Sequence, residues 1–362
     1  MRVVAKIGTS SVTDDSGAVD HGAIAKLTGE IAAVRAGGHE VLLVSSGAVA
    51  AGVAALGFEA RPTDMLTLQA VSAVGQSRMM RVYNDELAAF GLVGAQVLVD
   101  PHDFVDRTQY LHARDTLARL LELSCVPIIN ENDAIANDEL RYGDNDRIAA
   151  LVAHAVGADL LVLLTDLDGL FTADPRSHAE ATLIQLVDAL DPLLSIRASV
   201  NGSGRGSGGM ASKLAAARIA SWSGVRTVIA RASRPDVLVD AVGDRHVGTT
   251  FAAHDRRLPA RKLWIAFAAE VAGSITVDEG ARQALTTRST SLLPAGVRSV
   301  AGRFAEGDTV DVLGPDGVAF ARGMVFVAAA DLREVAGRQT RDLPQGMVHE
   351  VIHRDDLVML PT

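Results

Sequence analysis

The first two thirds of the chain alternate short apolar runs with longer segments rich in alanine and leucine. The apolar runs have the length of strands, and several are apolar throughout, as is typical of parallel strands covered on both faces. The predicted strands are RVVAKI (from Arg2), EVLLVSS (from Glu40), GAQVLV (from Gly94), VPIIN (from Val126), DLLVLLT (from Asp159) and RTVIA (from Arg226). Helices are predicted between them, for example in AIAKLTGEIAAVRAG, QYLHARDTLARLLEL and MASKLAAARIASWSG. This alternation predicts an α/β fold, with a parallel-rich sheet sandwiched by helices.

The pattern changes after HDRRLPARKLW, residues 254–264, a basic, proline-containing stretch that we interpret as a linker. The runs GSITVD, AEGDTVDVLGPDGVAFARGMVFVA and VIHRDDLVML follow, and turn signals separate them. Such runs predict a small β-rich barrel or sandwich. The sequence therefore predicts two domains, residues 1–258 and residues 259–362, the second including the linker.

Composition narrows the class of protein. Of the 362 residues 48% are hydrophobic and 22% charged, which is typical of a soluble globular protein. The net charge of -10 argues against tight non-specific binding to nucleic acid, which depends on Lys and Arg. The single cysteine, Cys125, excludes an intrachain disulfide and indicates a reducing compartment. No apolar run approaches the ~18 residues of a membrane span, and the N-terminus lacks a signal-peptide pattern. We expect a cytoplasmic protein without a membrane partner.

Polar side chains at the ends of the predicted strands are the first candidates for chemistry, because ligands of such sheets bind beyond the carboxyl ends of the strands. Lys6 lies between apolar residues in the first strand, and this position favours a ligand-facing lysine over a surface lysine. Ser46 follows the second strand in VSSGAVAAG, where a helix begins. Its hydroxyl can contact a ligand or simply cap the helix, and the sequence leaves both interpretations open.

Two further segments carry polar residues after strands. NENDAIANDELRYGDNDRIAA, from Asn130, contains a cluster of acidic and amide side chains, and GDND then opens an apolar helix. Asp and Asn at such a place can bind the waters of Mg²⁺, orient lysines or grip an amino group, although a solvated loop is the alternative. Thr165 and Asp166 close the fifth strand in LLTDLDGLFTADPR. Their place at a carboxyl edge is consistent with a nucleotide contact or with an ordinary strand exit.

The glycine-rich stretch NGSGRGSGGMASKL, from Asn201, has the character of a phosphate cradle. It misses the Walker A pattern, because Ser212 stands where the second glycine is required. Its glycines leave backbone N–H groups free to face an anion, and the N-terminus of the following helix favours phosphate. Lys213 falls in the first turn of that helix. Two lysines, an acidic cluster and a glycine-rich cradle fit phosphoryl transfer, and an acceptor carboxylate, with a pKa of about 4.3, needs no general base.

HEVIH, His349 to His353, matches the zinc-protease pattern H-E-x-x-H. Its surroundings predict a strand, in which residues four apart lie ~13 Å from each other, too far to share one metal ion. We therefore reject a zinc site and assign no residue as a metal ligand.

The chain closely resembles, over essentially its whole length, the glutamate 5-kinase (γ-glutamyl kinase) branch of the amino acid kinase family, with a C-terminal PUA domain. The motifs that carry this resemblance are VVAKIGTSSVT, VSSGAVAAG, AVGQSRMM, HARDTLARL, VPIINENDAIA, YGDNDRIAA, LLTDLDGLFTADPR and GSGGMASKLAAA. In the last third, GSITVDEGARQAL, TSLLPAGVRSV and VIHRDDLVML resemble the PUA domain. The resemblance implies the amino acid kinase fold for residues 1–258 and ATP-dependent phosphorylation of the L-glutamate γ-carboxylate to L-glutamyl 5-phosphate, the first step of proline biosynthesis.

The resemblance also implies residue roles, with ATP and Mg²⁺ as cofactors. Lys6 and Lys213 stabilise the transferring phosphoryl group, and Asp146 orients these two lysines. L-Glutamate is held by Ser46, Asp133 and Asn145. The residues expected to bind ATP are Lys6, Thr165, Asp166, Ser207, Gly208, Gly209, Met210, Ala211, Ser212 and Lys213.

Two other functions are considered. A sibling kinase would act on acetylglutamate, aspartate, carbamate or a nucleoside monophosphate, and the residues alone do not choose among these acceptors. An RNA-binding protein is suggested only by the PUA-like region, where acidic residues outnumber basic ones and argue against it. The resemblance implies a homo-oligomer, a dimer or a tetramer. Many members of the family are inhibited by proline, and the sequence leaves open whether proline is a feedback inhibitor here.

Overall fold

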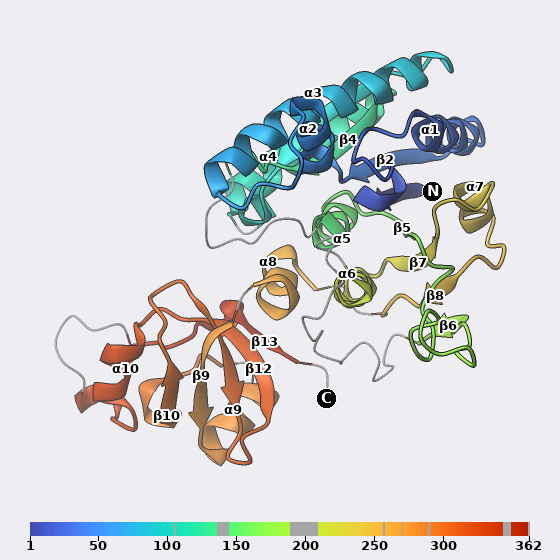
Figure 1. The fold of residues 1–362 in the computed structure, drawn as a ribbon. Coiled ribbons are helices and arrows are strands. Elements are labelled where there is room, and N and C mark those ends of the chain that lie inside the picture. Colours follow the sequence, from blue (N-terminus) through green and yellow to red (C-terminus); the bar gives the residue numbers. More distant parts are fainter. Residues whose placement is uncertain are drawn as a thin grey trace. The chain divides into compact units, whose positions relative to one another are not determined.

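The computed structural model describes residues 1–104, 106–135, 145–188, 209–255, 258–269, 271–288, 290–342 and 349–360. Two compact units make up the chain, Met1–Arg257 and Leu258–Thr362, and each contains a sheet of its own (Figure 1). None of the helices in the described ranges combines the length and the apolar character that crossing a membrane requires.

The first unit is built on an eight-stranded sheet with the order β3-β4-β2-β1-β5-β7-β8-β6. All neighbouring strands are parallel except β7 and β8, which are antiparallel. The strands are β1 (Arg2–Ile7), β2 (Glu40–Ser45), β3 (Gly94–Val99), β4 (Val126–Glu131), β5 (Leu160–Thr165), β6 (Leu186–Val187), β7 (Arg226–Arg231) and β8 (Thr249–Phe251). Each strand predicted for this unit is present, and the short strands β6 and β8 were not predicted.

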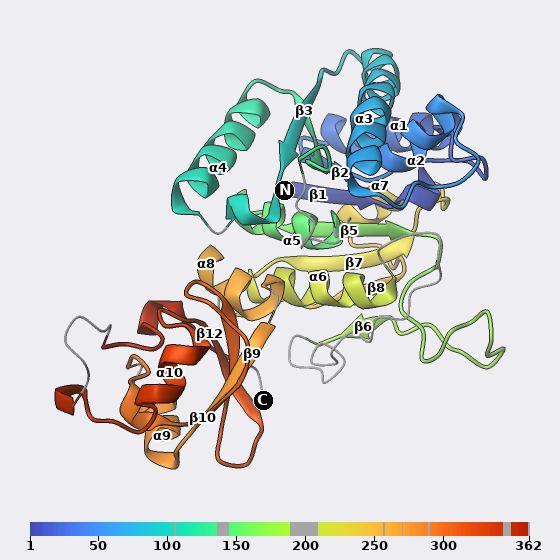
Figure 2. The ribbon, with the colours of Figure 1, turned by 60° about the vertical axis from the view of Figure 1, so that its left-hand side comes forward.

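Helices cover both faces of this sheet, so the predicted α/β sandwich is confirmed. They are α1 (His21–Ala36), α2 (Ala48–Leu56), α3 (Met65–Ala88), α4 (Arg107–Glu122), α5 (Asn145–Ala155), α6 (Met210–Trp222) and α7 (Val237–Val242), with the short turns η1 (Thr9–Ser11) and η2 (Pro101–Phe104). Helices α1, α3 and α7 share one hydrophobic core with the sheet. On the other face α5 and α6 pack together, and Figure 2 shows them running alongside the central strands β1, β5 and β7. Aspartate side chains start several of the helices; for example, Asp20 accepts a hydrogen bond from the backbone N–H of Ala23.

The alternation of side chains along β1 explains where Lys6 points. Val3, Ala5 and Ile7 belong to the core shared with α1 and α3. Lys6, one residue out of step, must face the opposite side of the sheet, where α5 packs against β1. In the ladder Lys6 pairs with Val44 on β2 and with Leu163 on β5. The lysine therefore lies in the middle of the sheet, near the carboxyl ends of three parallel strands.

The second unit contains a five-stranded sheet with the order β10-β9-β11-β12-β13, in which only β9 and β11 pair in parallel. Its strands are β9 (Val271–Val277), β10 (Val297–Gly302), β11 (Thr309–Leu313), β12 (Ala319–Met324) and β13 (Leu357–Met359). Its helices and turns are α8 (Ala260–Leu263), η4 (Trp264–Ala268), α9 (Glu279–Arg288), η5 (Pro294–Gly296), α10 (Ala329–Val335), η6 (Thr340–Asp342) and η7 (Arg354–Asp356). The predicted β-rich character is confirmed for this unit.

Two local features of this part of the chain differ from the interpretation of the sequence. The stretch interpreted as a linker, residues 254–264, contains the short helix α8, and Leu263 is fully buried. The run VIHRDDLVML is not one strand, because η7 interrupts it and only Leu357–Met359 pairs with β12. HEVIH is therefore neither a helix nor a continuous strand; within it, Ile352 makes an isolated bridge to Leu292.

Candidate active site

Lys6 lies against a buried carboxylate. Its Nζ is 2.8 Å from Oδ1 of Asp146, which stands in the first turn of α5. Only 4% of Lys6 and 1% of Asp146 is exposed to solvent. Charged side chains are almost never buried to this extent unless they are paired, so each residue stabilises the other in its charged form. Lys6 is thus buried and paired rather than a surface lysine, and its partner comes from the segment that the sequence marked as acidic; that Lys6 faces a ligand stays a prediction.

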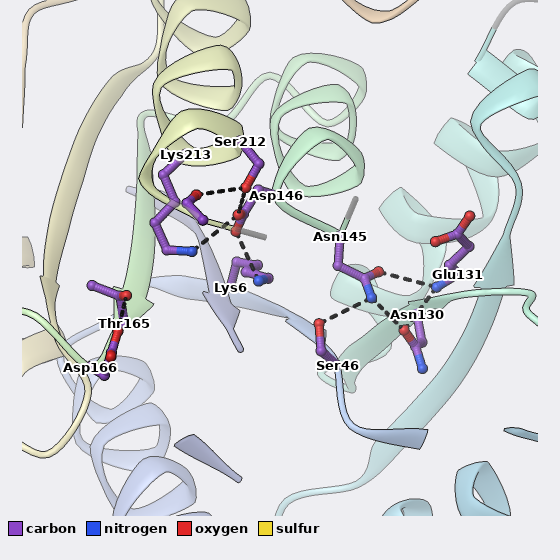
Figure 3. Close-up of polar contacts among 11 residues, drawn as sticks. Lys6, Ser46, Asn130, Glu131, Asn145, Asp146, Thr165, Asp166, Ser212 and Lys213 are labelled. Atoms are coloured by element: carbon purple, nitrogen blue, oxygen red, sulfur yellow. Dashed lines mark hydrogen bonds and ion pairs between the residues drawn. The ribbon is translucent and has the colours of Figure 1, made fainter. Parts of the chain in front are cut away.

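A second lysine shares the same carboxylate. Lys213, in the first turn of α6, places its Nζ 3.1 Å from Oδ2 of Asp146, and 4% of Lys213 is exposed. The hydroxyl of Ser212 donates to the same Oδ2 over 2.6 Å. Figure 3 shows Lys6, Ser212 and Lys213 converging on Asp146. The contacts agree with the resemblance, in that both lysines pair with Asp146, and the orienting role of this aspartate stays a prediction.

The electrostatic balance at Asp146 favours the ionised form. Burial raises the pKa of this carboxyl, but the ammonium groups of Lys6 and Lys213 and the hydroxyl of Ser212 outweigh burial and bring the pKa to about 2. Asp146 is therefore a carboxylate at any pH at which the protein works. Two cations and one anion leave a net positive charge in a nearly water-free position, which suits an incoming phosphate.

Next to this charged cluster lies a network of amides and a hydroxyl. Asn145, beside Asp146 in α5, donates from Nδ2 to Oγ of Ser46 over 3.1 Å and to Oδ1 of Asn130 over 2.9 Å. The backbone N–H of Glu131 donates to Oδ1 of both Asn130 and Asn145. Because a backbone N–H can only donate, both amides must present oxygen to it, and their orientation is fixed. Ser46 accepts from Asn145, and its own hydroxyl hydrogen has no acceptor in the part of the chain that the structure describes.

Asp133 stands after β4 and is 8% exposed. The hydroxyl of Ser72 in α3 donates to its Oδ2 over 3.0 Å. Burial raises the pKa of this carboxyl, against the opposing effects of Ser72 and of the nearby Arg61. Asp133 lines a cavity of about 250 Å³, together with Ser72 and Gln76 of α3 and residues of β3 and the end of β4. Among the described residues, no hydrogen bond joins Asp133 to Ser46 or Asn145.

Thr165 and Asp166 occupy the carboxyl end of β5. Thr165 is buried, Asp166 is exposed, and the threonine hydroxyl donates to Oδ1 of Asp166 over 3.0 Å. Since β1 lies between β2 and β5 in the sheet, Lys6 stands between Ser46 on one side and Thr165 on the other. The sheet thus separates the residues expected to hold the acceptor from those expected to hold the nucleotide, with the lysines between them (Figure 3).

Two helices begin beside the cluster without a capping side chain. Helix α2 starts after Gly47 and α6 starts after Gly209, and neither N-terminus receives a side-chain hydrogen bond within the described residues. Gly209 is exposed, and within the described ranges the backbone N–H groups of Gly209, Met210 and Ala211 have no acceptor, so they can face an anion. Gly47 has φ +107°, a conformation that favours glycine, and a Cβ there would come within 3.1 Å of Val12. Both starts are suited to binding negative charge.

Two of the sequence-predicted ATP residues, Ser207 and Gly208, lie outside the described residues, as do the first two residues of GDND. No group of three or more His, Cys, Asp or Glu side chains that could hold a metal ion occurs in the part of the chain that the structure describes. The donor set is instead one carboxylate already engaged by two lysines. Mg²⁺ commonly binds through one or two carboxylates together with substrate phosphates, and this site fits an ion that is held largely by a nucleotide.

Comparison with known proteins agrees with this geometry. The family model of the amino acid kinase family matches residues 1–231, and that of the PUA domain matches residues 273–347. The chain belongs to the amino acid kinase family. Among its relatives, the glutamate 5-kinase of Deinococcus radiodurans is 46% identical over 99% of this chain and 100% of its own length. The glutamate 5-kinase of Mycobacterium ulcerans is 45% identical over 98% of this chain and 96% of its own length. The resemblance stated from the sequence motifs is confirmed.

Solved structures share the fold at lower similarity. Carbamate kinase from Giardia lamblia, bound to AMP-PNP, matches with a TM-score of 0.51 and 17% identity, over 70% of this chain and 98% of that chain. Isopentenyl phosphate kinase from T. acidophilum, as a product complex, matches with a TM-score of 0.50 and 18% identity, over 69% of this chain and 100% of that chain. At these identities the comparison shows the fold alone.

Sequence reasoning missed several residues of the site. Asn130 and Glu131 were seen only as part of a polar segment, and Ser72 and Gln76 were given no role. Gln76 belongs to the motif AVGQSRMM, which helps to carry the resemblance to the family. The spacing of four residues places Ser72 and Gln76 on one helix face, but their burial, which makes a polar partner necessary, is seen only in the structure.

Proposed function

We propose that this protein is a glutamate 5-kinase, which transfers the γ-phosphoryl group of ATP to the γ-carboxylate of L-glutamate and forms L-glutamyl 5-phosphate. This is the first step of proline biosynthesis. The observation that carries the proposal is the pairing of Lys6 and Lys213 with the single buried carboxylate of Asp146. Relatives named glutamate 5-kinase, about 45% identical over nearly the whole chain, support the acceptor assignment.

The reaction needs neutralisation of charge more than proton transfer. A carboxylate oxygen of glutamate attacks the γ-phosphorus, the bond to the β,γ-bridging oxygen breaks, and ADP leaves. The acceptor is already ionised at neutral pH, so no base is required. Lys6 and Lys213 offset the repulsion between carboxylate and phosphate, and both are held in place by Asp146. Burial of all three side chains strengthens these interactions.

The acceptor is proposed to lie on the β2 and β4 side of Lys6. Ser46 offers a hydroxyl hydrogen to a carboxylate oxygen, and Asn145 holds that hydroxyl in place. The uncapped start of α2 adds backbone N–H groups that favour negative charge. Asp133, at the cavity beside α3, provides the negative charge that an ammonium group needs. A small amino acid with a second carboxylate therefore fits this side, with a carboxylate at Ser46 and the start of α2 and its ammonium group at Asp133.

The nucleotide is proposed to lie on the β5 side. Thr165 and Asp166 contact the nucleotide, while the start of α6, from Gly209 to Lys213, faces its phosphates. Ser207 and Gly208 belong to the same proposed loop. Mg²⁺, bound to the nucleotide, supplies further neutralisation of phosphate charge. The separation of Thr165 from Ser46 by β1 leaves Lys6 at the point where the two substrates meet.

Further properties are proposed from the family resemblance and from composition. The resemblance to the family supports a homo-oligomer, a dimer or a tetramer, and makes proline a candidate feedback inhibitor. The lone cysteine fits a reducing compartment such as the cytoplasm. Sedimentation of the purified protein, and activity measured against proline concentration, test the first two.

The experiment is ADP release from Mg-ATP with L-glutamate, with hydroxylamine present to trap an acyl phosphate as a hydroxamate. We expect glutamate-dependent hydroxamate from the wild type and its near-complete loss in Lys213→Ala. Lys262→Ala, a lysine of the second unit that contacts the backbone carbonyl of Arg354, is the matched control and keeps activity. Aspartate, acetylglutamate and carbamate are tested as alternative acceptors in the same assay, alone and in competition with glutamate. Turnover of one of these, without turnover of glutamate, overturns the acceptor assignment and leaves the kinase chemistry in place.

A further inference from the structure

We propose that one face of α3, formed by Ser72, Gln76 and Tyr83, positions the acceptor side of the active site, so that these three are positioning residues for the reaction. The proposal rests on the proposed function, because it assigns roles within the same site. Residues 72, 76 and 83 fall on one face of a helix, since steps of four and seven residues return close to the same direction. All three are buried, at 4%, 9% and 1% exposure. Buried polar groups in an otherwise apolar stripe need a partner, and each of these has one at the site.

Gln76 acts on the amide network. Its Oε1 accepts a hydrogen bond from Nδ2 of Asn130 over 2.8 Å. Asn130 in turn accepts from Asn145, which donates to Ser46. The backbone N–H of Glu131 fixes which atom of Asn130 is oxygen, so the NH₂ group of Asn130 must point at Gln76. Without that acceptor the NH₂ group is left buried and unsatisfied, and the orientation of Asn145 loses its support.

Ser72 acts on Asp133. Its hydroxyl donates to Oδ2 over 3.0 Å, so α3 holds one oxygen of this carboxylate in place. The hydrogen bond also opposes the effect of burial and favours the charged form of the carboxylate. An ionised Asp133 is the form that attracts an ammonium group.

Tyr83 acts on the end of β2. The hydroxyl of Ser45 donates to the backbone carbonyl of Ser46 over 3.1 Å. The contact of 2.9 Å between Ser45 Oγ and the Tyr83 hydroxyl therefore has the tyrosine as donor. The chain of hydrogen bonds runs from Tyr83 through Ser45 to Ser46, the residue proposed to meet the acceptor carboxylate. Removal of the tyrosine hydroxyl would break the contact with Ser45, so the end of β2, next to Ser46, would be held less firmly.

The contact between α3 and α2 makes this positioning rigid. A Cβ on Gly75 of α3 would lie 1.8 Å from the backbone oxygen of Ala48, and a Cβ on Gly52 of α2 would lie 1.9 Å from the backbone oxygen of Val71. Only glycine permits so close an approach of the two helices. Helix α2 begins at Ala48, two residues after Ser46, so α3 is fixed against the segment that it orients.

The test compares steady-state kinetics of Ser72→Ala, Gln76→Met and Tyr83→Phe in the full-length protein. We expect each variant to raise the KM for L-glutamate about fivefold to tenfold, the effect of one lost hydrogen bond, while the KM for ATP stays within about twofold. Gln76→Met combined with Asn130→Ala raises the KM no further than Asn130→Ala alone, because Gln76 acts through Asn130. Gln76→Glu retains an acceptor for Asn130 and restores much of the affinity. Arg81→Ala, at an exposed position of α3, is the control and leaves both KM values unchanged.

Several outcomes overturn the proposal. A glutamate KM within twofold of the wild type in all three variants shows that this face of α3 only packs, as does an equal rise in the KM for ATP. The shift in melting temperature caused by Mg-ATP identifies any variant that has lost its fold, and Tyr83→Phe and Ser72→Ala each remove a single oxygen. If the wild type does not use glutamate, the proposed function fails. The same comparison with the acid that is turned over then still decides the role of α3.

Discussion

Lys6 and Lys213 bind opposite oxygens of one buried carboxylate, with Lys6 Nζ 2.8 Å from Oδ1 of Asp146 and Lys213 Nζ 3.1 Å from Oδ2. The two lysines come from β1 and α6, near opposite ends of the first unit's sequence. Two ammonium groups held this close repel each other, and the shared carboxylate offsets that repulsion before any phosphate arrives. We therefore propose that Asp146 acts on the reaction by holding the two ammonium groups in place for the transferring phosphoryl group.

Replacement of Asp146 by Asn is expected to damage both catalysis and stability. The lysines lose their common anchor, so kcat should fall by about 100-fold or more. Two buried ammonium groups also lose their partner, which costs about 3–5 kcal/mol of the free energy of unfolding. Urea denaturation and the hydroxamate assay measure the two effects. Asp244→Asn, which removes an exposed carboxylate paired with Arg226, is the control and should change stability by less than about 1 kcal/mol.

The pH dependence of stability, compared between the wild type and Asp146→Asn, gives an independent check on the pairing of Asp146. The folded pKa of Asp146, about 2, is below the ordinary value of 3.8. A carboxyl with a lowered folded pKa contributes stability that is fully present above pH 3.8 and is lost as the pH falls toward 2. The difference in urea midpoint between wild type and Asp146→Asn should therefore be constant from pH 5 to 7 and shrink below about pH 4. A difference that stays constant down to pH 2 contradicts the strong pairing of Asp146.

Much of the first unit follows from apolar patterning. The runs around Val4, Leu42 and Val162 predict parallel central strands, because only a sheet covered on both faces buries such residues continuously. Lys6 was recognisable as a functional candidate for the same reason, since a charge in such a strand needs a partner. The partner itself was not derivable from spacing. Asp146 meets Lys6 only because β1 lies in the middle of the sheet and α5 crosses that face.

Other features depend on tertiary context. Strands β6 and β8 are too short to show a period, and β8 pairs antiparallel to β7 on one side and with the edge strand β6 on the other. Residues 260–263 read as a basic linker, yet Leu263 is buried and the segment is helical. Gln76 looks like any polar residue of a helix until β4 places Asn130 beside it. Hydrogen-bond partners far apart in sequence are set by the order of the strands, which no local pattern contains.

Ser212 is expected to matter through Asp146 as well as through the nucleotide. Its hydroxyl donates over 2.6 Å to the same oxygen that Lys213 binds. Ser212→Ala removes this donor, and we expect kcat to fall about tenfold, with a smaller effect on the melting temperature. Ser212→Thr keeps the hydroxyl and should retain most of the activity. Equal loss in both variants would assign the effect to packing at the start of α6. Ser221→Ala, at the far end of the same helix, is the control for helix integrity.

The charge on Asp133 is expected to lower the stability of the protein and to strengthen the binding of glutamate. Burial raises the pKa of this carboxyl, so the folded protein holds its proton more strongly than the unfolded chain does. The free energy of unfolding therefore falls as the pH rises from 3.8 through the raised pKa, because ionisation in the buried position is unfavourable. Asp133→Asn removes this penalty and should melt at or above the wild-type temperature at pH 7. The KM for glutamate should rise by about tenfold or more, since the ammonium group loses its counter-charge. Calorimetry across pH 4–7 and steady-state kinetics test the two halves, and a destabilised variant with unchanged KM contradicts both.

The order of the strands predicts that substitutions can weaken the binding of glutamate and the binding of ATP separately. Ser46 and Asn145 lie on the β2 side of Lys6, and Thr165 lies at the end of β5 on the other side. Asn145→Ala should raise the KM for glutamate by about tenfold, because Ser46 loses the donor that holds its hydroxyl. Thr165→Val keeps the shape of the side chain, removes its hydroxyl, and should raise the KM for ATP with little change for glutamate. Isothermal calorimetry of nucleotide binding to each variant, in the absence of glutamate, separates nucleotide affinity from turnover.

Lys6 lies between the proposed acceptor side and the proposed nucleotide side. Lys6→Met should therefore lower kcat even when either substrate is in excess. Thr165→Val could instead raise the KM for glutamate as strongly as Asn145→Ala does. In that case the two substrates do not occupy opposite sides of β1, and the placement of the acceptor beside Ser46 is wrong.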